Sequence, residues 1–96
     1  MKKKHEKIVN ADSEEGQMAG EAMVEIIENQ LAENNPPETR LTLDRLMGMG
    51  ETRENAMRYI ASVLSVEIFH MLKEQEMFDE ARYVGNLKAL PTLPDA

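Results

Sequence analysis

The segment from Arg53 to Glu76 constrains the fold more than any other part of the chain, because apolar residues cover most of its circumference. At about 100° per residue, its apolar arc spans roughly two-thirds of a helix. Met57, Ile60 and Leu64 belong to its main apolar stripe, whereas Val66 and Phe69 point elsewhere. A helix this apolar has to be enclosed by its own fold or by a second subunit. We therefore expect it to be the central helix of its domain.

Three further helices are expected around this one, so the predicted fold class is all-α. Apolar spacing and capping residues predict helices over residues 14–33, 37–49, 53–76 and 79–90. The connections are short, which favours packing of consecutive helices as neighbours. Phe78, just before the last helix, is expected to pack on Tyr83. The prediction is a compact four-helix bundle-like domain over 13–91, with flexible tails at 1–12 and 92–96.

Composition and charge exclude several classes of function. The 96 residues include no cysteine, which rules out disulfides and thiolate chemistry and fits a cytoplasmic protein. No apolar run approaches the roughly 20 residues that span a bilayer, so no membrane partner is expected. The net charge of -7 opposes binding to nucleic acid, including through a helix-turn-helix at the GMGET stretch, residues 48–52.

One pair of residues raises the question of a metal site. Glu67 and His70 lie three residues apart on the third predicted helix, the spacing of a metal half-site in helix bundles. The other histidine, His5, lies in the N-terminal tail, so one chain cannot supply a complete set of ligands. We favour a structural role for the pair and expect no cofactor. A metal-binding protein or metal-dependent enzyme that joins two half-sites across a dimer is the alternative.

Two polar residues are expected inside the bundle. Glu67 falls within the apolar arc of its helix, and Gln30 points toward the apolar face of the first helix. A buried carboxylate needs a partner, or its pKa must rise. Gln30, Arg53 and Arg82 are the candidate partners of Glu67. Such a group would fix which helices pack together, without a catalytic role.

Parts of the chain resemble a bacterial family of small all-helical proteins of unknown function. The resemblance rests on ENQL at 28–31 and on the stretches 36–64 and 78–91. It implies an α-helical fold in the bacterial cytoplasm, and no activity. Relatives often carry His-Glu-Ala-x-His at the place of ENAMR, residues 54–58. Both histidines and the glutamate of that zinc-binding pattern are replaced here, which argues against a metal at this place.

The sequence therefore favours a non-catalytic protein-interaction module over an enzyme. We expect the chain to form a homodimer through a two-fold contact of its third helix. An unidentified protein is a second possible partner. The residues expected at the interaction surface are Val66, Phe69, Met57, Ile60 and Leu64.

Overall fold

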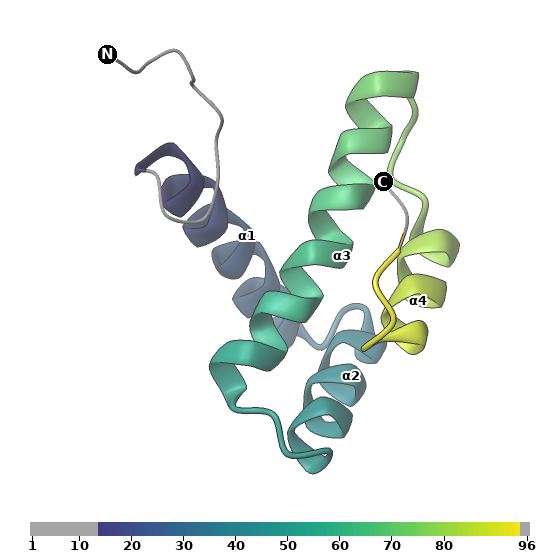
Figure 1. Ribbon diagram of the computed structural model, residues 1–96. Coiled ribbons are helices and arrows are strands. Elements are labelled where there is room, and N and C mark those ends of the chain that lie inside the picture. Colours follow the sequence, from purple (N-terminus) through teal and green to yellow (C-terminus); the bar gives the residue numbers. More distant parts are fainter. Residues whose placement is uncertain (1–13, 95–96) are drawn as a thin grey trace.

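The computed structural model describes residues 14–94, with side chains from residue 20 onward. These residues form four α-helices and no strand: α1 (Glu14–Glu33), α2 (Pro37–Gly48), α3 (Arg53–Glu74) and α4 (Glu80–Ala89) (Figure 1). The predicted all-α fold with four helices is confirmed. The predicted tail at 1–12 lies outside the described residues.

The helix boundaries follow from local chemistry. The Thr52 side chain accepts a hydrogen bond from the Asn55 N–H at 3.0 Å and so caps α3. The Asp79 carboxylate does the same for α4, accepting from the Arg82 N–H at 3.0 Å. α3 ends at Glu74, two residues earlier than predicted, because Gln75 adopts the left-handed conformation with a φ of 55°.

α3 is the central helix, as its apolar circumference predicted. It packs against each of the other three helices, and α2 also packs against α1 and α4. In Figure 1, α3 runs the length of the molecule, with α1 on one side and α2 and α4 on the other. The N-terminal end of α1 diverges from the C-terminal end of α3, so the helices are close together only over part of their length.

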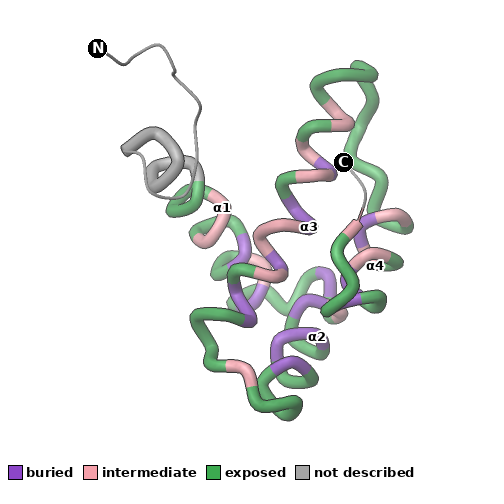
Figure 2. Tube along the Cα trace, viewed as in Figure 1, coloured by how far each residue is buried: buried purple, intermediate pink, exposed green. Residues whose placement is uncertain are grey.

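The core lies where the four helices converge, and Figure 2 shows the buried positions concentrated there. Its members are Ile27, Leu31, Leu43, Leu46, Ala56, Met57, Ile60, Val63, Leu64, Tyr83, Leu87 and Leu90. Three residues that the sequence assigned to an interaction surface are therefore core residues of a single chain. Met57, Ile60 and Leu64 are at most 4% exposed, and this assignment is corrected. Packing of the four helices buries most of the apolar arc of α3 within a single chain.

Polar contacts tie the helices together at two places. The Gln30 Oε1 atom accepts hydrogen bonds from the Thr39 hydroxyl at 2.8 Å and from the Tyr83 hydroxyl at 2.9 Å. One amide oxygen thus links α1, α2 and α4. The Arg45 guanidinium of α2 donates to the Leu90 carbonyl at 2.6 Å and to the Leu87 carbonyl at 3.0 Å, at the C-terminal end of α4.

Candidate interaction surface

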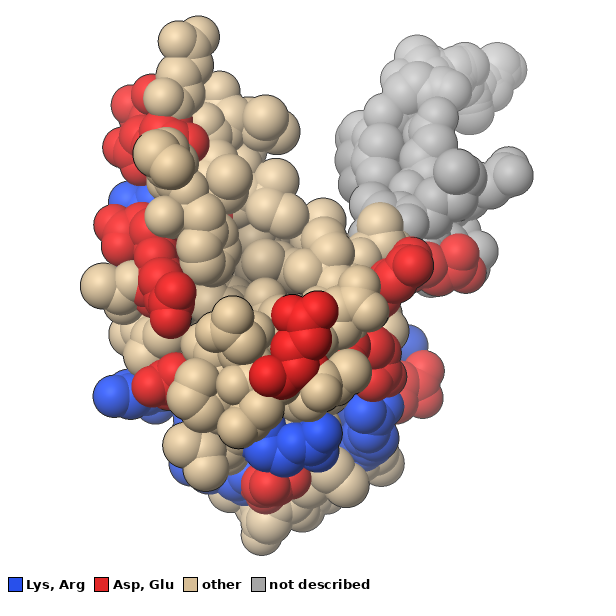
Figure 3. Space-filling view, turned by 180° about the vertical axis from the view of Figure 1, so that it is seen from behind, with Lys and Arg blue, Asp and Glu red and all other residues tan. Residues whose placement is uncertain are grey.

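The C-terminal half of α3 exposes large apolar side chains. Phe69 is 49% exposed and Leu72 is 76% exposed, while Val66 is partly buried. The loop that follows adds Met77, 86% exposed, and Phe78. Seen from behind, the described surface carries uncharged residues over much of its upper part, with acidic side chains along its edge and most of the basic side chains lower down (Figure 3). Single exposed apolar residues are ordinary on a protein surface, but a group of them indicates a binding surface.

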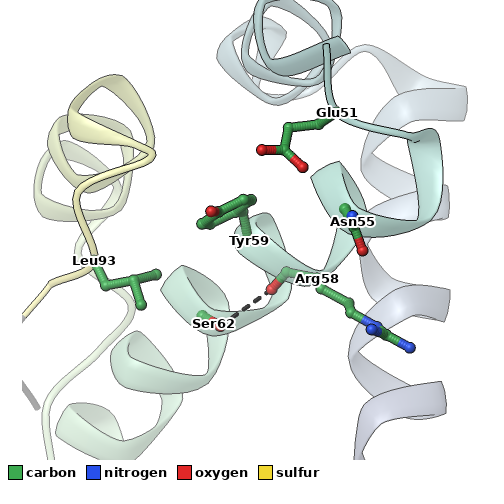
Figure 4. A pocket seen from close by; sticks show the side chains of 6 residues that line it. All are labelled: Glu51, Asn55, Arg58, Tyr59, Ser62 and Leu93. Atoms are coloured by element: carbon green, nitrogen blue, oxygen red, sulfur yellow. Dashed lines mark hydrogen bonds between the residues drawn. The ribbon is translucent and has the colours of Figure 1, made fainter. Parts of the chain in front are cut away.

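An open groove of about 350 Å³ lies along the other half of α3 (Figure 4). Its lining residues are Glu51, Asn55, Arg58, Tyr59, Ser62 and Leu93. The ring of Tyr59 lies in the middle of the groove, with Leu93 on one side and Glu51 on the other. The Arg58 side chain points away from the ring and pairs with Glu54 at 3.3 Å.

Sequence reasoning missed the part that Leu93 plays in this groove. Leu93 was assigned to the flexible tail at 92–96, but the chain turns after α4 and brings Leu93 beside α3. The Thr92 N–H donates to the Ala89 carbonyl at 2.9 Å within this turn. The one signal in the sequence is an apolar residue between two prolines, Pro91 and Pro94, which restrict the backbone.

Glu67 is enclosed and bound by Arg82, one of the three partners considered. Its carboxylate is 0% exposed and accepts from Arg82 Nε at 2.9 Å and from Arg82 Nη2 at 2.8 Å. The Asp79 N–H donates to the same carboxylate at 3.1 Å. The Arg82 guanidinium, and then the Asp79 N–H, hold the pKa of Glu67 below its ordinary value despite burial.

The other two candidate partners bind elsewhere. Gln30 accepts from Thr39 and Tyr83 and is only partly buried. Arg53 forms a two-bond ion pair with Glu28, at 2.9 Å and 3.1 Å, which lowers the pKa of Glu28. The arginines at the start of α3 are thus paired with glutamates, Arg53 with Glu28 and Arg58 with Glu54. This pairing does not favour a helix that reads nucleic acid.

The geometry around Glu67 and His70 does not favour the alternative of a metal half-site. Both carboxylate oxygens of Glu67 are occupied by Arg82 and Asp79, and a guanidinium stands where a cation would bind. The His70 ring is oriented edge-on to Phe69, with ring centroids 6.0 Å apart. Among the described residues, no three His, Cys, Asp or Glu side chains gather where they could hold a metal ion.

The ion pair of Glu67 also positions the loop that carries the exposed apolar residues. Arg82 bonds to Glu76 at 3.3 Å as well as to Glu67, so α3, the loop and α4 meet at one guanidinium. Phe78 packs on Tyr83 with ring centroids 5.3 Å apart, as the sequence predicted. The backbone N–H of Asp79 is fixed by the same carboxylate. The loop is therefore held at both ends.

Comparison with known proteins gives no relative from which a function could be transferred. No family model, curated protein or solved structure matches this chain. The resemblance to a bacterial family of unknown function therefore stays a prediction. None of the described helices combines the length and the apolar character that crossing a bilayer requires.

Proposed function

We propose that this protein is a non-catalytic helical interaction module that forms a homodimer through the exposed surface of α3. The observation that carries the proposal is the exposure of Phe69 and Leu72 on a helix whose opposite side is the centre of the core. Two of the residues expected at the interface from sequence, Val66 and Phe69, belong to this surface.

Nothing in the described residues favours a catalytic role instead. The enclosed carboxylate, Glu67, is already bound by an arginine, and the pKa of that carboxyl is lowered, whereas a general acid needs a raised pKa. Ser62 and Ser65 donate their hydroxyl hydrogens to helix carbonyls, at 3.1 Å and 3.3 Å. These serines have no neighbouring base in hydrogen-bond contact. The lack of cysteine and the family resemblance support placing the protein in the bacterial cytoplasm.

Sedimentation velocity over a concentration series tests the proposal. We expect a monomer–dimer equilibrium with a dissociation constant on the order of micromolar, the range typical of small interfaces. A sedimentation coefficient that stays at the monomer value up to several hundred micromolar would refute self-association. Light scattering on the same samples gives the mass directly.

A further inference from the structure

A regular stripe of side chains runs along the exposed surface of α3. Successive members are separated by alternating steps of four and three residues, which is the spacing of a coiled-coil seam. The stripe consists of Asn55, Tyr59, Ser62, Val66, Phe69 and Lys73. At about 100° per residue, all six lie within roughly 80° of the helix circumference. They lie on the side of α3 opposite to Met57 and Leu64, which are in the core.

The residues that the structure describes leave this seam at least partly open to solvent. Asn55, Phe69 and Lys73 are exposed, and Tyr59, Ser62 and Val66 are partly exposed. The Ser62 hydroxyl donates to the Arg58 carbonyl at 3.1 Å, so this donor does not depend on water. Covering Ser62 therefore carries little desolvation cost. An apolar surface can therefore pack on the middle of the stripe at little cost in desolvation.

Glu51 and Lys73 place opposite charges at the two ends of the stripe, and Arg58, which also lines the groove, is paired with Glu54. Glu51 lies at the groove end, two residues before α3 begins, and Lys73 lies at the other end. The Lys73 ammonium is 5.7 Å from the centre of the Phe69 ring. An antiparallel contact between two such stripes brings Lys73 of each copy toward Glu51 of the other. A parallel contact would place like charges together, which is unfavourable.

We propose that a second copy of this chain covers the stripe, with the two α3 helices antiparallel about a two-fold axis and Phe69 of each copy seated in the groove of the other. This inference rests on the proposed homodimer and adds its orientation and its contacts. Because neighbouring positions of an antiparallel seam pair in opposite order, Tyr59 meets Phe69, Ser62 meets Val66 and Asn55 meets Lys73. The two-fold axis makes each contact occur twice.

The groove is suited to an aromatic side chain. The Tyr59 ring lies in the middle of the groove between Leu93 and Glu51, and Ser62 also lines it. Phe69 is the largest apolar side chain on the stripe, and half of its surface is open to solvent. Offset or edge-on packing of Phe69 on Tyr59 would give each copy one aromatic pair. In this arrangement Phe69 of one copy packs as a knob into the groove beside α3 of the other copy, as in knobs-into-holes packing.

Cysteine cross-linking tests the orientation, since the natural chain has no cysteine to interfere. Ser62→Cys protein and Val66→Cys protein are mixed, oxidised under native conditions and analysed by intact mass. The antiparallel register predicts that the mixed disulfide exceeds its statistical share, because Ser62 of one copy faces Val66 of the other. Disulfides that join identical residues would indicate a parallel seam and overturn the inference.

Substitutions test the contacts. Phe69→Ala should raise the dissociation constant of the dimer about 100-fold, because the change removes the same contact twice. Leu41→Ala is the matched control, as Leu41 is 64% exposed on α2 and lies off the stripe. Lys73→Glu and Glu51→Lys should each weaken the dimer, and the double variant should restore it. Circular dichroism verifies that every variant keeps its helices.

The outcomes separate this inference from the proposed function. A protein that stays monomeric in the concentration series defeats both. A dimer that Phe69→Ala leaves as tight as before, or whose charge-swapped double variant is no tighter than the single variants, keeps the proposed function and overturns the antiparallel α3 contact. A dimer with mixed disulfides that Phe69→Ala dissociates supports both.

Discussion

Replacing Glu67 with glutamine removes one charge from an enclosed site and leaves the shape of the side chain almost unchanged. The carboxylate is 0% exposed and accepts three hydrogen bonds, two of them from the Arg82 guanidinium. Glutamine keeps one acceptor oxygen, and its amide NH2 would face a donor. We therefore expect Glu67→Gln to lose at least one charge-assisted bond, which contributes about 1.5–3 kcal/mol.

The exposure of Arg82 limits that loss. The Arg82 side chain is 34% exposed, so water can hydrate the freed guanidinium. We expect the free energy of unfolding to fall by about 2 kcal/mol for Glu67→Gln. For a domain of this size, the melting temperature should fall by roughly 10 °C. Differential scanning calorimetry at neutral pH measures both quantities.

A second carboxylate on the same arginine provides the control. Glu76 binds Arg82 at 3.3 Å but is 45% exposed, so Glu76→Gln should change the free energy of unfolding by at most about 0.5 kcal/mol. The reasoning is wrong if the melting temperature of Glu67→Gln equals that of the natural protein within error, or is no lower than that of Glu76→Gln. In either case the enclosed ion pair does not stabilise the fold.

The pH dependence of the same variant gives an independent measurement. The pKa of Glu67 is lowered by folding, so its contribution is present above the ordinary value of 4.5 and disappears as the pH falls through the folded pKa. The difference in melting temperature between the natural protein and Glu67→Gln should be widest near neutral pH. It should shrink progressively below pH 4.5. A difference that grows in acid would contradict the lowered pKa.

Three further substitutions, one control substitution and one analysis test other parts of the structure. Ile60→Ala should lower the free energy of unfolding by about 2–5 kcal/mol in urea titrations, because Ile60 is fully buried, whereas Leu41→Ala should change it by less than about 0.5 kcal/mol. Thr52→Ala should cost about 1 kcal/mol in thermal melts by removing the cap of α3. Tyr83→Phe should cost about 1 kcal/mol in the same melts by removing the hydrogen bond to Gln30. Elemental analysis of untagged protein should find no stoichiometric transition metal, since the carboxylate oxygens of Glu67 are occupied.

The helix boundaries could be predicted from the sequence because they depend on neighbours in the chain. Thr52 and Asp79 act as caps through hydrogen bonds that span three residues. Asn34 adopts the left-handed conformation that ends a helix, with a φ of 52°. The central position of α3 could also be predicted, because an unusually wide apolar arc requires neighbours on several sides.

The residues of the exposed surface could be predicted only in part, because their exposure depends on how far each neighbouring helix reaches along α3. Periodicity places apolar residues such as Met57, Ile60 and Phe69 around the helix, but it does not tell which of them the other helices cover. The position of Leu93 beside Tyr59 depends on a turn after α4 that has no periodic signal. That Glu67 pairs with Arg82, and not with Gln30 or Arg53, depends on the path of the loop between α3 and α4.

The bond between Arg45 and the end of α4 has a consequence for synthesis in the cell. The carbonyl that Arg45 binds belongs to Leu90, which is added to the growing chain 45 residues later. At typical rates of translation, that interval lasts roughly 2 to 9 s. During this time α2 lacks α4, one of the three helices that it packs against, so its packing is incomplete. Intermediates that expose apolar surface are prone to aggregation, so the partly made protein carries that risk until α4 has been added.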